Sequence, residues 1–169
     1  MNIDHQYTGI ILTVGNSMMG DDGAGPLLAE KLQQQPIEQW FVIDGGSTPE
    51  NVVHNIRQLK PKQLLIVDAT EMGLAPGEVR FVDVDLIAEM FLMNTHNMPL
   101  TFLVEQLKED IPIIDFLGIQ PDIVGFYYPM TEKVKQGIDK IYDALKSDRL
   151  KTEFIALNKE SNYESIYQC

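Results

Sequence analysis

A glycine-rich segment with two adjacent aspartates, residues 15–25, is where the sequence most clearly offers chemistry. Its outline suggests a phosphate-binding loop, but the spacing fits neither G-x-G-x-x-G nor G-x-x-x-x-G-K-[ST]. Asp21 and Asp22 also put negative charge where a phosphate needs free amides or a lysine. The segment therefore favours a bound cation over a phosphate.

The two aspartates have a structural explanation as well, because a carboxylate at a helix start caps free N–H groups and interacts favourably with the helix dipole. Neighbouring side chains point in different directions, so the two residues can differ in role. We assign Asp21 mainly to capping and predict that Asp22 faces the cleft where a ligand would bind.

Asp68 and His96 are the other candidates for this cleft. In open α/β sheets, ligands bind beyond the carboxyl ends of the strands, and Asp68 directly follows the apolar run 64–67. A turn-forming aspartate fits that position equally well. His96 lies in a polar loop, where an imidazole is more often a surface group than a ligand. If this loop returns to the cleft, Asp22, Asp68 and His96 make an O,O,N set suited to a divalent ion such as nickel or zinc.

The remaining candidates for a catalytic site are weaker. For Asp44, which precedes a Gly-Gly pair, we favour a turn. His5 lies near the N-terminus and His54 falls on an expected helix, so we place neither at the site. HExxH, G-x-S-x-G and Asp-Thr/Ser-Gly motifs are absent. A triad of Ser17 with His96 and an aspartate lacks the spacing of a nucleophile elbow.

The elements that must position these residues alternate between short apolar runs and longer stretches of helical period, which predicts an α/β domain. We expect strands at residues 9–14, 40–44, 63–68, 78–83, 113–118 and 122–127. We expect helices at residues 24–34, 48–59, 86–93 and 99–109, and a last one from about Thr131. We assign a single domain to residues 1–147, and expect the polar tail, residues 148–169, to be mobile or loosely docked.

Charge and cysteine content limit the partners and the compartment. With 13 Lys+Arg against 25 Asp+Glu, the formal net charge is -12, which disfavours nucleic acid and anionic membranes. The single cysteine, Cys169, allows no intramolecular disulfide and no CxxC pair, which fits a cytoplasmic protein. The first residues lack the features of a signal peptide, and no apolar run approaches about 18 residues, so we expect neither export nor a membrane span.

Several segments together resemble the hydrogenase maturation endopeptidase family. In chain order they are GNSMMGDDGAGP (15–26), DGGS with PEN (44–51), LLIVDAT (64–70), THNMPL (95–100) and FLGIQPDIVGFYYPM (116–130). The similarity covers roughly residues 9–145, which is nearly the whole expected domain.

The resemblance implies a three-layer fold, in which a twisted, mostly parallel sheet is flanked by helices on both faces. It implies that Asp22, Asp68 and His96 are the catalytic and metal-contacting set, although the first carboxylate of the family is commonly a glutamate. It also implies an aspartic-type endopeptidase. Its partner would be the precursor of a [NiFe] hydrogenase large subunit, from which it removes the C-terminal extension after nickel insertion. We expect it to act as a monomer.

A physical hypothesis for the role of nickel follows. If the ion arrives already held by thiolates of the precursor, Asp22, Asp68 and His96 complete its coordination and thereby detect it, and docking positions the scissile peptide. The Met18-Met19 pair can seat the substrate tail, although we favour the more common role of methionine as a core gap-filler. Gln120 and the following proline are expected to fix a turn.

Two other interpretations stay open. A noncatalytic nickel-sensing chaperone would use the same residues without turnover. A receiver domain also carries two acidic residues after its first strand and one after its third, and binds magnesium. Here, however, the acidic pair lies several residues past the strand, and the segment after Tyr127 lacks the lysine that such a site needs.

Overall fold

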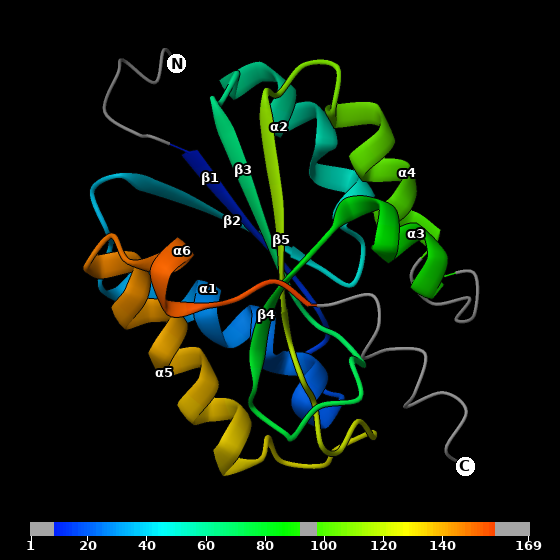
Figure 1. Cartoon of the computed structure of the whole chain (residues 1–169), viewed down its shortest axis with the longest axis vertical. Coiled ribbons are helices and arrows are strands. Elements are labelled where there is room, and N and C mark those ends of the chain that lie inside the picture. Colours follow the sequence, from blue (N-terminus) through cyan, green and yellow to red (C-terminus); the bar gives the residue numbers. More distant parts are fainter. Residues whose placement is uncertain (1–8, 92–97, 158–169) are drawn as a thin grey trace.

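The computed structural model describes residues 9–91 and 98–157. A five-stranded sheet in the order β2-β1-β3-β5-β4 forms the centre of the molecule (Figure 1). The strands are β1 (Gly9–Val14), β2 (Trp40–Gly46), β3 (Gln63–Ala69), β4 (Val79–Val82) and β5 (Ile113–Ile119). All neighbouring strands are parallel except β4, which runs antiparallel to β5. The predicted mostly parallel α/β sheet is confirmed.

Helices cover both faces of this sheet (Figure 1). They are η1 (Gly20–Gly23), α1 (Ala24–Gln34), η2 (Pro49–Val52), α2 (Val53–Leu59), α3 (Val84–Phe91), α4 (Met98–Leu107), α5 (Glu132–Lys146) and α6 (Leu150–Glu153). The expected helix at residues 48–59 begins with a 3-10 turn, and Thr48 precedes it without a side-chain cap bond. Within the described part of the chain, no helix is long and apolar enough to cross a membrane.

The inner strands are buried on both faces because each face packs against helices. Successive side chains of a strand point to opposite faces, so Ile10 and Leu12 of β1 join one core and Ile11 joins the other. The first core lies under α2, α3 and α4, and the second lies under α1 and α5. This accounts for the three layers.

The strand expected at residues 122–127 is wrong, because these residues form an exposed loop beyond the end of β5. Both neighbouring positions in the sheet are already occupied, since β5 pairs with β3 on one side and β4 on the other. The backbone also turns sharply, with Tyr127 in the left-handed region at φ 63°. The apolar and β-branched residues that predicted a strand here are instead exposed in this loop.

The tail after Ser147, which we expected to be mobile or loosely docked, packs against the rest of the chain over residues 148–157. Phe154 and Leu157 are buried in the two cores. The N–H of Phe81 donates to Ile155 O at 3.0 Å, and the N–H of Leu157 donates to Phe81 O at 2.8 Å. The segment thus covers the free edge of β4, where unpaired strand groups would otherwise face solvent.

Candidate active site

The candidate site lies at the carboxyl ends of β1 and β3, which are neighbours in the centre of the sheet. After β1 the chain continues to β2, which lies on one side of β1, and then to β3, which lies on the other side. Ligands of open α/β sheets bind where the strand order reverses in this way. The segment that leaves β1 passes through η1, which contacts β3, before α1 begins. The fold therefore brings the residues after β1 next to the end of β3.

Two glycines allow the segment after β1 to fold tightly. Gly15 has a φ of 142°, and a Cβ there would overlap the carbonyl oxygen of Asp22. The turn closes because the N–H of Asn16 donates both to Asp22 O and to Asp22 Oδ2, at 3.1 Å each. Gly20, at φ 60°, lies against the carbonyl oxygen of Ile123. Asp22 is thereby held at the edge of the sheet, half-buried.

Asp68 lies at the end of β3 and is almost completely buried, with 3% of its surface exposed. Burial raises the pKa of Asp68 well above its usual value, and the negative charge of Asp22 raises it further, while the backbone amide of Ala69 partly opposes them. The influence of Asp22 requires the two carboxylates to be near each other. Asp68 and the turn that carries Asp22 thus lie at the ends of neighbouring strands, with η1 in contact with β3, and their shared role in a functional site stays a prediction.

The third member of the predicted set, His96, lies outside the residues that the structure describes. Among those it does describe, no group of three or more His, Cys, Asp or Glu residues could hold a metal ion. His54 is exposed on α2, as expected of a surface residue. The turn favoured for Asp44 is confirmed, because its Oδ1 accepts hydrogen bonds from the N–H of Gly46 at 3.0 Å and the hydroxyl of Thr13 at 3.2 Å.

Asp21, next to Asp22, is fully buried and accepts four hydrogen bonds. Its Oδ2 accepts from the N–H groups of Asp122 and Ile123, at 2.9 and 3.0 Å, and from the hydroxyl of Thr131 at 2.8 Å. Its Oδ1 accepts from the N–H of Thr131 at 2.7 Å. Burial alone would raise the pKa of Asp21, but these bonds outweigh it and lower the pKa.

We expected Asp21 to cap the helix that begins beside it, and this expectation is wrong. Neither η1 nor α1 has a side-chain hydrogen bond at its N-cap. Asp21 instead ties η1 to the loop after β5 and to Thr131, the residue that precedes α5. A long-range contact of this kind leaves no local sequence signal, whereas helix capping does.

Gln120, at the end of β5, supports the other side of the site. Its buried Oε1 accepts from the N–H groups of Met72 at 2.7 Å and Leu74 at 3.2 Å, and its Nε2 donates to Glu71 Oε1 at 3.0 Å. These bonds hold the loop that directly follows Asp68. The glutamine that we expected to fix a turn thus holds a loop from another part of the chain.

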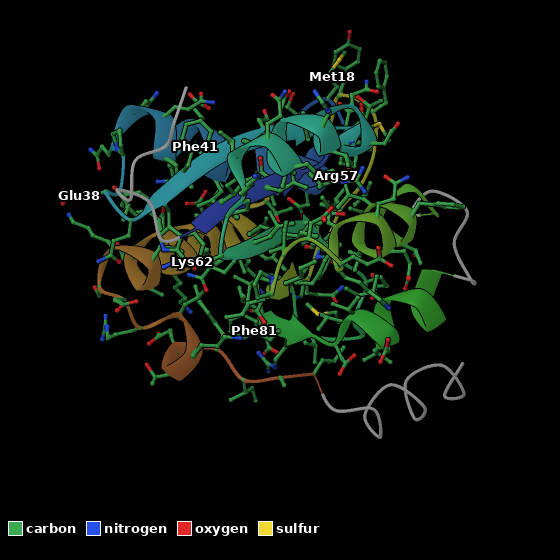
Figure 2. The ribbon with its side chains drawn as sticks, turned by 90° about the horizontal axis from the view of Figure 1, so that it is seen from above. Met18, Glu38, Phe41, Arg57, Lys62 and Phe81 are labelled. Carbon is green, nitrogen blue, oxygen red and sulfur yellow. The ribbon has the colours of Figure 1, made fainter. Side chains whose placement is uncertain are left out.

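An exposed apolar surface beside Asp22 was not expected from the sequence. We call it the apolar rim, and it consists of Met18, Ile123, Val124, Phe126, Tyr127 and Tyr128. The N–H of Tyr127 donates to Met18 O at 2.9 Å, which joins its two segments. Figure 2 shows Met18 at the margin of the molecule, so the core role that we favoured for this methionine is wrong.

Comparisons with known proteins agree on one family. A family model described as hydrogenase maturation protease matches residues 26–148, which include Asp68 and residue 96 but not Asp22. The hydrogenase 3 maturation protease of Escherichia coli K12 is 64% identical over 139 residues, covering 82% of this chain and 89% of that protein.

Solved structures give the same result. The endopeptidase HycI from Escherichia coli superposes with a TM-score of 0.84 at 60% identity, covering 90% of this chain and 98% of that one. A [NiFe] hydrogenase maturation protease from Thermococcus kodakarensis KOD1 superposes with a TM-score of 0.72 at 27% identity, covering 88% of this chain and 95% of that one. Fold and sequence thus point to the same relatives.

Proposed function

The chain belongs to the hydrogenase maturation protease family and is a peptidase, and from this premise we propose that it removes the C-terminal extension of a [NiFe] hydrogenase large-subunit precursor. We propose further that it does so in the cytoplasm after nickel has been inserted, and that nickel is the element it recognises. The observation that carries this proposal is the pair of carboxylates, Asp22 and Asp68, at the carboxyl ends of β1 and β3.

A pair of neighbouring carboxylates in a largely buried place suits a cation. Each negative charge makes the other more costly, which is why the pKa of Asp68 is raised by burial and by Asp22. A bound divalent cation would relieve both the burial and the repulsion. Carboxylate oxygens with one imidazole nitrogen suit a borderline ion such as nickel.

Two carboxylates do not complete such a site, so the proposal assigns the third position to His96. Three ligands from this chain leave room for ligands from the precursor. In this proposal the nickel is part of the substrate, and Asp22, Asp68 and His96 bind it only while the precursor holds it. Binding fixes the scissile peptide close to the ion, where a carboxylate oxygen that does not hold the ion takes a proton from the attacking water.

The test is to incubate the purified chain with large-subunit precursor prepared with and without nickel, and to measure the precursor's mass. We expect the nickel-loaded precursor alone to become shorter. Asp22→Ala, Asp68→Ala and His96→Ala should each give a folded protein that no longer shortens it.

Each other outcome has a distinct meaning. Shortening of both precursors would show that nickel is not the recognition element. Binding of the loaded precursor without shortening would identify a noncatalytic nickel-sensing chaperone. Full activity in all three alanine variants would remove these residues from the site.

A further inference from the structure

The apolar rim exposes large side chains that soluble proteins ordinarily bury. Tyr127 is 75% exposed and Phe126 is 60% exposed, and Tyr128 and Val124 are also more than half exposed. The rings of Phe126 and Tyr127 lie with their centroids 4.1 Å apart and their planes tilted by 52°, so they form one aromatic unit. A contiguous exposed apolar surface of this kind marks a site of interaction.

The rim is also held in place, at a conformational cost. Tyr127 has a φ of 63°, a region that bulky residues rarely adopt. Three bonds fix the loop there: Asp21 accepts from the N–H of Ile123 at 3.0 Å, the N–H of Asp21 donates to Ile123 O at 2.8 Å, and the N–H of Tyr127 donates to Met18 O at 2.9 Å. Strain that surrounding contacts maintain is concentrated at functional sites.

The rim is continuous with the candidate active site. Met18 belongs to the same tight turn as Asp22, in which the N–H of Asp22 donates to Met19 O at 3.2 Å. The other segment of the rim bonds to Asp21, the neighbour of Asp22. A polypeptide whose scissile bond lies at Asp22 and Asp68 would therefore pass over or beside the rim.

Charge indicates which polypeptide fits. Residues 15–20 and 123–131 carry no charged side chain, while the whole chain has a net charge of -12. An acidic segment would be repelled by the surrounding protein and would gain no ion pair at the rim. An apolar segment, uncharged or basic, would bury its side chains on the rim without that cost.

We propose that the apolar rim binds an extended, apolar and non-acidic segment of the precursor polypeptide next to the scissile bond. This inference rests on the proposed function, since it places the rim in substrate binding. The aromatic pair would contribute most, because aromatic side chains dominate the binding energy of protein interfaces.

Two rim variants and one matched control test the inference. Phe126→Ala removes one ring of the aromatic pair. Phe102→Ala removes a ring of similar exposure, 65%, on α4, which lies away from the loop after β5 (Figure 1). Tyr127→Asn removes the other ring, and asparagine tolerates a positive φ better than tyrosine does, so this variant should fold at least as stably as the native chain.

Kinetics of processing of the nickel-loaded precursor, the dissociation constant of that precursor and Tm should be measured for all four proteins. We expect Phe126→Ala and Tyr127→Asn each to raise KM and Kd by about 10-fold while kcat changes less than about twofold. Phe102→Ala should match the native chain. Tyr127→Asn should show the weaker binding with an unchanged or higher Tm, which separates lost contact from lost folding.

The remaining outcomes each decide the matter. If the native chain shortens the precursor and both rim variants keep its KM and Kd, the rim inference is wrong and the proposed function stands. If the native chain binds the precursor without shortening it, and the rim variants bind more weakly, the proposed function fails and the rim inference stands. A native dimer that Tyr127→Asn converts to a monomer would assign the rim to a second copy of the chain and overturn the inference.

Discussion

Asp21 and Asp68 are both buried carboxylates at the same edge of the sheet, yet their pKa values shift in opposite directions. Burial opposes the ionised form of each. Around Asp21 four hydrogen bonds outweigh that penalty, whereas around Asp68 the charge of Asp22 adds to it and only the amide of Ala69 opposes it. Asp68 also lies deeper in the protein than Asp21, so a larger burial penalty and fewer hydrogen-bond partners act in the same direction.

This contrast separates two roles that the sequence places side by side. Asp21 is ionised and satisfied, so it stabilises the fold by joining η1 to the loop after β5. Asp68 is held in a place where its charge is unfavourable, and a fold that keeps such a group gives up stability. Groups of that kind are concentrated at functional sites. Substitution of each aspartate can show whether the two divide stability and function in this way.

Replacing Asp68 by asparagine should have the largest effect. We expect Asp68→Asn to reduce processing by at least about 100-fold. The same change should raise Tm in the metal-free protein, because asparagine cannot ionise. The pKa of Asp68 is raised in the folded state, so its contribution to stability is full below the unfolded value of about 3.9 and is lost as pH rises through the folded pKa. The gain in Tm should therefore grow with pH.

Asp44→Asn is the matched control for this prediction. Asp44 lies near the end of the parallel strand β2, but its side chain is exposed and closes a turn that asparagine can also close. Asp44→Asn should leave processing unchanged. A Tm that falls on Asp68→Asn would show that the ionised carboxylate stabilises the fold, and the contrast with Asp21 would disappear.

Asp22→Asn tests the link between the two candidate site residues. Processing should again fall by about 100-fold or more. In addition, the pKa of Asp68 should fall toward its usual value, because one of the two causes that raise it is removed. An NMR titration of the Asp68 carboxyl carbon measures this directly. An unchanged Asp68 pKa would mean that the two carboxylates do not interact, and that the pair is not a site.

The sheet and most helices could be predicted from the sequence because their patterns are local. The strand at residues 9–14 and the helix at residues 24–34 have the bounds expected from hydrophobic runs and helical period. The loop at residues 122–131 could not be predicted in this way. Its conformation depends on Asp21, about a hundred residues earlier, and on the occupation of both sides of β5.

The candidate site was predictable in part for the same reason. Asp68 follows a buried strand and Asp22 lies in a glycine-rich turn, so the rule that ligands bind beyond strand ends was enough to select them. Asp21, and not its neighbour Asp22, faces the loop after β5 because it bonds to Thr131. No local sequence pattern predicts which of the two aspartates does so. The apolar rim could not be predicted because its β-branched and aromatic residues are also typical of a strand.

A smaller effect is expected when Asp21 is replaced by alanine. Asp21→Ala leaves the N–H groups of Asp122, Ile123 and Thr131 without their acceptor, which should lower the free energy of unfolding by about 2–4 kcal/mol. The pKa of Asp21 is lowered in the folded state, so its stabilisation is present above about pH 4 and is lost as pH falls through the folded pKa. Urea unfolding at neutral and acidic pH should show the deficit narrowing in acid.

Asp21→Ala and Asp22→Asn should differ in processing activity when both are measured at a temperature where both variants are folded. Asp21→Ala should retain at least about a tenth of native activity, because it moves the site without removing a reacting group. A loss as complete as that of Asp22→Asn would show that Asp21 belongs to the catalytic pair.

The smallest effect should come from Thr131→Val, which removes one of the four donors to Asp21 and keeps the backbone N–H of residue 131. One lost bond to a charged acceptor should lower the free energy of unfolding by about 1–2 kcal/mol. It should also raise the pKa of Asp21, since the Thr131 hydroxyl helps to lower it. Thr152→Val is the matched control, because its exposed hydroxyl donates only to Arg149 O, at 3.1 Å. Equal losses from Thr131→Val and Asp21→Ala would mean that the backbone donors contribute nothing, and that the carboxylate serves the hydroxyl alone.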